Sequence, residues 1–497
     1  MANGRMNDFY SQYEKLVEKY EMQEKTLKET NASIKSLNKT IETLNKTIEK
    51  QNKTIEELNK EILRLKTKND RDSSNSSKPS GTNGYKKVIT NRREKSDKKK
   101  GGQLNHVPHS LKNKLDKFIK SGDVIEEIVE INKNDFNKDK RYIEKIVIDI
   151  KMVKVIKRYR YYIHEDGKYH IPEYHNQYVQ YGSNIKSIAM DLMINLPNST
   201  DGIVRFINDL SNGGISLSKG TLINWQNELA NKSNGSINTI ENKLLDAYYL
   251  NADESQIKID GELYNVLCAC NNKYVRLWPS KHKSQEAIDE INFLPKYKGI
   301  IVKDGTELYN KYGLYLSQCI SHILRYLKGI YDYVEHKGPK KLSDFLTKIN
   351  NTRNEYIKAG KKSFSKEEYN SFMSEYDNII NEWEIELKND TRNHLFDEEY
   401  NLFKRLKYDC KKMNKDIRGD KEEILYFIKD FKVPSTNNAA EVSQRGVKIK
   451  QKNGKFRSFE GAENYLIIKS CILTFKKLEL DILKSIKTTF EGKTVLA

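Results

Sequence analysis

The most regular pattern in the chain is a seven-residue repeat of apolar positions near its start. The first series holds Ile34, Ile41, Ile48, Ile55 and Ile62, and the second, three residues later, holds Leu37, Leu44, Leu58 and Leu65, with Gln51 as its one polar member. Isoleucine followed by leucine at these positions favours a parallel two-stranded coiled coil. We therefore expect residues 1–70 to dimerise. The alternative is one amphipathic helix packed on its own domain.

Strand-like and helical patterns follow one another after residue 105. Ile146, Ile148 and Ile150 alternate with other residues, which is typical of a strand, so residues 106–182 are predicted to be β-rich. Residues 183–245 are predicted to be helical, with a break at residues 212–214 and a cap for the next helix at or near Ser218. This pattern is compatible with a helix-turn-helix that reads DNA, although any helical hairpin looks the same.

Two apolar runs that lead into carboxylates predict a sheet within residues 246–335. The first run leads into Asp253 and Glu254, and the second leads into Asp304. We expect both aspartates at strand ends, where a sheet fixes their separation, and Glu254 on the opposite face from Asp253 if the strand continues. Carboxylate oxygens suit Mg²⁺ or Mn²⁺. Ordinary capping of strand ends is the other interpretation of these aspartates.

The remainder of the chain indicates a helical insertion and a C-terminal helix. Residues 336–430 combine dense charge with helical periodicity, as an inserted helical subdomain would. Residues 431–475 follow the insertion and contain Asn437, Asn438 and Glu441. Residues 476–497 are predicted to form a C-terminal helix and tail. The fold class is therefore multidomain α/β.

Charge and cysteine content narrow the class of partner. The net charge is +19, from 88 basic and 69 acidic residues, which favours a polyanion such as DNA, unless the lysines reflect compositional bias alone. Residues 71–105 are expected to be a basic flexible linker. No apolar run approaches the roughly 18 residues of a membrane span, and the N-terminus lacks an apolar signal region. Five cysteines form no CxxC pair, which fits a reducing cytoplasm.

A series of short motifs resembles one protein family in the order in which that family carries them. They are Asn-Ser-Ser-Lys-Pro-Ser (75–80), Lys-Gly-Gly-Gln (100–103), Gln-Tyr-Gly (180–182), Gly-Thr-Leu-Ile-Asn-Trp (220–225), Ala-Asp-Glu (252–254), Val-Lys-Asp-Gly (302–305), Cys-Ile-Ser-His-Ile-Leu-Arg (319–325), Asn-Asn-Ala-Ala-Glu (437–441) and Phe-Arg-Ser (456–458). Each motif is weak alone, but their ordered coincidence over nearly the whole chain is specific. The chain resembles the transposases of the insertion-sequence-66 family.

The resemblance implies a function and a set of site residues. It implies an RNase H-like core in two parts, residues 246–335 and residues 431–475, which the helical insertion separates, with Glu441 on a helix of the second part. Asp253, Asp304 and Glu441 would form an Asp-Asp-Glu triad that holds Mg²⁺ or Mn²⁺ for two-metal phosphoryl transfer on insertion-sequence ends. The expected DNA contacts are Arg325, Arg445, Lys448, Lys450, Lys452, Asn437 and Asn438. Cys319 and His322 match a family signature without a derived role. The implied partners are DNA, a second copy and accessory proteins of the same element, in a bacterial cytoplasm at the nucleoid.

Departures from the family pattern define the alternative function. Family members usually carry zinc-binding cysteine pairs after the Gly-Gly-Gln segment, but this chain has no cysteine before Cys268, so no zinc is expected. Asn251 stands where the family has His, Thr436 where it has Asp, and Val442 where it has Arg. The alternative to an active transposase is a catalytically decayed relative that only holds element ends. A coiled-coil scaffold whose charge is compositional is a third possibility.

Overall fold

The computed structural model describes residues 2–70, 155–172, 175, 177–196, 198–334, 336–390, 397–407 and 421–496. The predictions for residues 71–105 and 106–154 fall outside this part of the chain. The chain divides into two compact units. The first unit comprises Met1–Asn83, Val302–Lys311 and Tyr315–Asn437, and the second comprises Gly84–Ile301, Tyr312–Leu314 and Asn438–Ala497.

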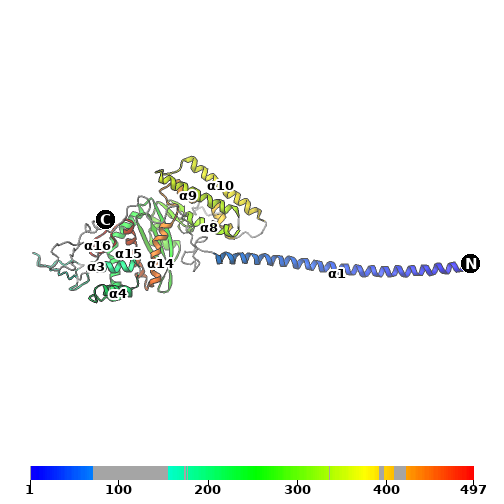
Figure 1. The fold of residues 1–497 in the computed structure, drawn as a ribbon, viewed down its shortest axis with the longest axis horizontal. Coiled ribbons are helices and arrows are strands. Elements are labelled where there is room, and N and C mark those ends of the chain that lie inside the picture. Colours follow the sequence, from blue (N-terminus) through cyan, green and yellow to red (C-terminus); the bar gives the residue numbers. More distant parts are fainter. Residues whose placement is uncertain are drawn as a thin grey trace, which may run out of the picture. The chain divides into compact units, whose positions relative to one another are not determined.

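The N-terminal segment of the first unit is one long helix, α1 (Ala2–Asp70), which is shown in Figure 1. Every α1 side chain that the structure describes is exposed, and the heptad residues are about half exposed, as in Ile34 at 50% and Leu37 at 61%. Apolar side chains at heptad spacing therefore line one stripe of α1 without burial in this chain. Pairing with a second copy remains a prediction.

Five strands form one mixed sheet in the order β3-β2-β1-β4-β5. Their bounds are β1 (Tyr249–Ile259), β2 (Glu262–Cys270), β3 (Val275–Ser280), β4 (Ile300–Lys303) and β5 (Tyr315–Gln318). β1 pairs antiparallel with β2, and β2 with β3. The Ile300 N–H donates to the Tyr248 carbonyl where both β1 and β4 begin, so these two strands run in the same direction. The mixed α/β class is confirmed, and the RNase H-like core remains a prediction.

The α-helices of the second unit come from before, between and after the strands in the sequence. They are α3 (Ser183–Met190), α4 (Thr200–Leu210), α5 (Lys219–Lys232), α6 (Asn234–Leu245), α7 (Gln285–Ile291), α14 (Asn438–Asn453), α15 (Phe459–Lys477) and α16 (Ile482–Phe490). A π-helical turn, Asp191–Asn195, extends α3. α14 packs on β1 and β2, while α15 packs on β3.

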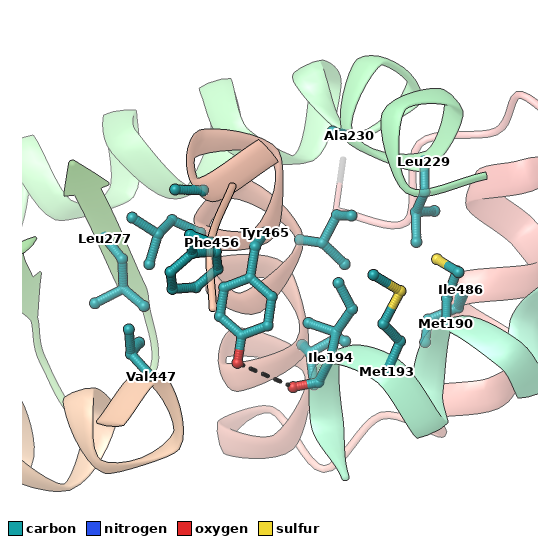
Figure 2. Close-up of a cluster of buried hydrophobic side chains, with 14 of the residues drawn as sticks. Met190, Met193, Ile194, Leu229, Ala230, Leu277, Val447, Phe456, Tyr465 and Ile486 are labelled. Atoms are coloured by element: carbon teal, nitrogen blue, oxygen red, sulfur yellow. Dashed lines mark hydrogen bonds between the residues drawn. The ribbon is translucent and has the colours of Figure 1, made fainter. Parts of the chain in front are cut away.

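The core of the second unit joins its sheet to α15 and to the helices before the sheet. Figure 2 shows Tyr465 of α15 among buried side chains, with its hydroxyl donating to the Ile194 carbonyl at 3.4 Å. Leu277 of β3, Val447 of α14 and Met190 of α3 are each fully buried. Burial of this many apolar groups is the main source of the unit's stability. Residues 183–245 thereby share one apolar core with the strands of the same unit, and most of their helices contact α15 or α16.

The predicted turn between α4 and α5 is confirmed in detail. Asn212 and Gly213 adopt positive φ values of 48° and 74°, a conformation that asparagine and glycine tolerate best. Ser218 caps α5, because its Oγ accepts the Thr221 N–H at 3.0 Å. By contrast, the described residues between 155 and 182 contain no strand. That portion of the predicted β-rich region is therefore irregular.

The helical part of the first unit has its own core. Its helices are α8 (Ile320–Val334), α9 (Lys337–Lys358), α10 (Lys366–Asn389), α11 (Asp397–Lys407), α12 (Lys421–Ile424) and α13 (Tyr426–Lys429). α9 and α10 lie side by side (Figure 1). Gly338 permits this approach, since a Cβ there would lie 2.1 Å from Cγ of the fully buried Trp383. Arg353 donates to the carbonyls of Phe427, Phe431 and Val433 and so holds α9 to α13 and to the segment after it.

Candidate active site

Asp253 lies in the middle of β1 rather than at its end. The strand continues to Ile259, and in the register with β2 Asp253 lies opposite Cys268. Side chains opposite one another in an antiparallel pair share a face of the sheet. Hydrogen bonding to Cys270 and burial hold the pKa of the Cys268 thiol well above its ordinary value, and the charge of Asp253 adds to that shift. The carboxylate of Asp253 thus lies on the same face of the β1–β2 pair as the Cys268 thiol.

Helix α14 places Glu441 one turn from the point where the helix is attached to β1. Gln444, which is buried, donates from Nε2 to the backbone carbonyl of Asp253 at 2.9 Å. Glu441 lies three residues earlier, in the first turn of α14, and is half-buried. Residues three apart on a helix lie on neighbouring parts of its surface. The second unit therefore brings the helix turn that carries Glu441 to the strand that carries Asp253.

Glu254 has a different environment from Asp253. Successive side chains in a strand point to opposite faces, and β1 continues through both residues. The Glu254 carboxylate, 5% exposed, forms an ion pair with Lys283 at 3.1 Å. An ion pair of this kind gives Glu254 a structural role of its own.

Asp304 begins the loop directly after β4, as predicted. Its Oδ1 accepts the Thr306 N–H at 3.0 Å, which closes a tight turn over Gly305. The preceding Lys303 is buried, and its Nζ donates to the Thr306 carbonyl at 2.9 Å and to Asn310 Oδ1 at 2.7 Å. Burial lowers the pKa of Lys303. The turn that carries Asp304 is thus fixed by hydrogen bonds to its backbone within the first unit.

A half-buried arginine from α11 lies at the same turn. A Cβ on Gly305 would lie 2.8 Å from Nη1 of Arg405, so the guanidinium packs directly on the glycine. Burial lowers the pKa of Arg405, and the nearby charge of Asp304 opposes that shift. Nε and Nη2 of Arg405 are buried without a hydrogen-bond partner in the described structure. Leaving buried donors unpaired costs about 1–3 kcal/mol, and more for a charged group.

One face of α14 carries exposed basic side chains in line with Glu441. At 100° per residue, five residues fall within an arc of about 80° of the helix surface: Asn438, Glu441, Arg445, Lys448 and Lys452. Asn438 is exposed, and so are Arg445, Lys448 and Lys452. We call Arg445, Lys448 and Lys452 the basic stripe. Lys450 was predicted to join them, but it lies on the other side of α14 and is only 7% exposed.

The other predicted DNA contacts differ in accessibility. Asn437 is fully buried, and its backbone N–H donates to Sγ of Cys319 at 3.1 Å, so its side chain is not available to DNA at the surface. Arg325 and His322 are half-buried on α8. Cys319 is buried at the start of α8, where it ties that helix to the segment before α14. This contact gives the Cys319 signature a structural explanation.

The described residues include no group of three or more His, Cys, Asp or Glu side chains arranged to hold a metal ion. Asp253 and Glu441 belong to the second unit, whereas Asp304 belongs to the first. The donor chemistry of the three nevertheless fits a hard cation, since Mg²⁺ and Mn²⁺ prefer carboxylate oxygens. The four described cysteines, Cys268, Cys270, Cys319 and Cys471, are buried and free of disulfides.

Comparison with known proteins defines the class of this chain as a transposase, an enzyme that binds, cuts and joins DNA. Residues 198–464 match the family model described as "Transposase IS66 family". The match covers more than half of the chain, so the chain belongs to the IS66 transposase family. No curated protein matches it. None of the helices that the structure describes has an apolar stretch of the length that a bilayer requires.

Proposed function

We propose that this chain cleaves the ends of an insertion sequence and joins the freed 3′-hydroxyl to target DNA, with Asp253, Asp304 and Glu441 as its catalytic carboxylates. The observation that carries the proposal is the attachment of α14 to β1, because Gln444 holds the Glu441 turn at Asp253 in a chain of the IS66 transposase family. The mixed sheet is proposed to be the RNase H-like core, interrupted by α9–α13.

The three carboxylates would hold Mg²⁺ or Mn²⁺, and bound ions would supply Lewis-acid activation of water and stabilisation of the leaving oxygen. The chain's own contribution is to fix the donors. Asp253 lies on a strand bonded on one side to β2, and Asp304 lies in a turn closed by Thr306. Positioned charges that need no rearrangement during reaction stabilise a transition state most effectively.

DNA binding is proposed to use the basic stripe of α14 and the α4–α5 hairpin. Arg445, Lys448 and Lys452 follow Glu441 along one helix face, where they can bind phosphates on either side of the cleaved bond. Exposed cations of this kind contribute affinity without reading sequence. The exposed N-terminal residues of α5, such as Lys219, are the proposed site of sequence reading.

The apolar stripe of α1 is proposed to pair with a second copy of the chain. Its heptad pattern matches the spacing of a parallel two-stranded coiled coil. A dimer would give one subunit for each end of an element, and accessory proteins of the same element are further proposed partners. The proposed cellular location is the bacterial cytoplasm, at the nucleoid.

Replacing carboxylates by amides tests the catalytic proposal. Asp253→Asn, Asp304→Asn and Glu441→Gln should each reduce Mg²⁺-dependent nicking of element-end DNA at least about hundredfold, a typical loss for a positioned electrostatic group. DNA binding and melting temperature should change little, because an amide keeps the shape of the carboxylate. Glu254→Gln is the matched control, since it changes the neighbouring carboxylate on the opposite face, and it should keep most of the nicking rate.

The outcomes separate the proposal from its alternative. If the parent protein binds element ends but never nicks them in Mg²⁺ or Mn²⁺, the decayed, DNA-holding relative is the better description. The departures from the family pattern at Asn251, Thr436 and Val442 would then explain the loss. If the parent nicks DNA and Glu441→Gln nicks it equally well, the enzyme class stands but the assignment of the triad is wrong.

A further inference from the structure

Arg405 lies at the Asp304 turn and has two donors without a partner among the described residues. It comes from α11, about a hundred residues after Asp304, and its guanidinium packs on Gly305 beside that carboxylate. Its guanidinium carbon lies 5.3 Å from the centre of the Tyr326 ring. Two of its nitrogens, Nε and Nη2, are buried and have no hydrogen-bond partner in the described structure. The Asp304 turn and α11 both belong to the first unit.

Two buried, unpaired donors on a half-buried arginine indicate a ligand. Arginine stays protonated in proteins, so its charge cannot be removed to lower the cost of burial. The neighbouring cation at this turn, Lys303, is buried and donates hydrogen bonds to Thr306 and Asn310. No ion pair between Arg405 and a carboxylate is found within the described residues, although the charge of Asp304 is close enough to affect the pKa of Arg405.

The chemistry of the missing partner follows from the donors. Nε and Nη2 form one edge of the planar guanidinium, and that edge matches two oxygens of a phosphate or carboxylate. Either anion would be repelled by Asp304 and attracted by Arg405, and a phosphate is the anion that a site processing DNA encounters. Glycine at position 305 leaves the space that the guanidinium occupies, since any side chain would collide with Arg405.

We propose that Arg405 is an anion-binding residue that α11 delivers to the Asp304 turn, where it binds a phosphate of the DNA substrate. The identity of the anion as DNA rests on the proposed function, but the presence of an anion site does not. The helical insertion would then contribute a residue that binds the substrate. In DNA cleavage, Arg405 would hold the non-bridging oxygens of that phosphate.

A melting experiment tests the anion site without reference to catalysis. The full chain, Arg405→Met and Lys404→Met are melted in sodium phosphate and in sodium chloride at equal ionic strength. Lys404 is the matched control, because it is the exposed cation next to Arg405 on α11. Phosphate should raise the melting temperature of the parent and of Lys404→Met, as any ligand of the folded state does. Arg405→Met should lose that rise and, in chloride, should melt no lower than the parent.

Two results would overturn the anion site. One is a parent whose melting temperature phosphate does not raise above that in chloride. The other is an Arg405→Met variant that melts several degrees lower in chloride, since that would make the arginine a structural group with a partner of its own. Arg405→Lys provides a second variant that keeps the charge but loses the two-pronged edge, and it should show a reduced phosphate response.

Nicking of element-end DNA then tests the role in the reaction. Arg405→Met should nick DNA about a hundredfold more slowly than the parent, a typical loss for one transition-state donor. Lys404→Met should nick DNA at the parent's rate. Normal nicking by Arg405→Met, together with a lost phosphate response, would refute the role in DNA cleavage. A parent that nicks nothing would refute the proposed function and leave the melting result as the measure of the anion site.

Discussion

The buried lysine of α15 offers a quantitative test of how the second unit is stabilised. Lys469 is 3% exposed, and its Nζ donates to the Ile194 carbonyl at 3.0 Å. Burial lowers its pKa from 10.5 to about 8, the charge of Lys476 adds to this effect, and Asp191 opposes it. Replacement by methionine keeps most of the length of the side chain and removes the charge.

The expected gain can be worked out from the pKa. Below about pH 8 the lysine is protonated in both the folded and the unfolded chain, so the folded state bears the whole cost of burying the ammonium. Each pKa unit corresponds to about 1.4 kcal/mol, which puts that cost at about 3 kcal/mol. Loss of the hydrogen bond to Ile194 offsets about 1 kcal/mol of it. Lys469→Met should therefore raise the free energy of unfolding at pH 7 by about 2 kcal/mol.

Denaturant unfolding of both proteins between pH 7 and pH 10.5 measures this difference. Between about pH 8 and 10.5 the unfolded state keeps a proton that the folded state has released, so the stability of the parent rises relative to the variant as pH increases. The advantage of Lys469→Met should thus shrink over this range. A variant that is less stable at pH 7, or a difference that stays constant with pH, would refute the reasoning.

Two further predictions concern association. Deleting residues 1–70 should reduce the sedimentation mass to that of a monomer, and an unchanged state of association would contradict pairing through α1. The slope of log DNA affinity against log salt concentration should become shallower when Arg445, Lys448 and Lys452 are replaced by glutamine. The expected change in slope is up to about three, one for each lost phosphate contact. An unchanged slope would exclude the basic stripe from DNA binding. The matched control replaces three exposed lysines of α9, namely Lys340, Lys341 and Lys348.

Local signals in the sequence predicted some elements well and others incompletely. The α4–α5 turn was predictable, because asparagine and glycine at positive φ and a serine cap act within a few residues. The length of β1 was not predicted, because the apolar run stops at Asp253. The strand continues in a half-exposed form, with Ile257 and Ile259 buried on alternate positions, and this alternation is a signal that the sequence does carry.

The site was predictable only where its residues belong to motifs. Asp253, Asp304 and Glu441 could be named from the resemblance, and their joint role remains a prediction. Gln444 and Arg405 could not be named, because both act through tertiary contacts with residues distant in the chain. Nothing local distinguishes Arg405 from the other basic residues. The run of lysines at 448, 450 and 452 looks uniform in sequence, and helix geometry is what buries Lys450.

The exposure of the α1 side chains that the structure describes couples the folding of this helix to the amount of protein present. A helix of 69 residues spans about 100 Å, and helices without tertiary packing draw little stability from propensity alone. If the stripe pairs with a second copy, mass action makes both the pairing and the helix depend on concentration. A cell that holds few copies of the protein would then hold few assembled pairs. The abundance of the transposase would thereby limit how often two element ends are brought together.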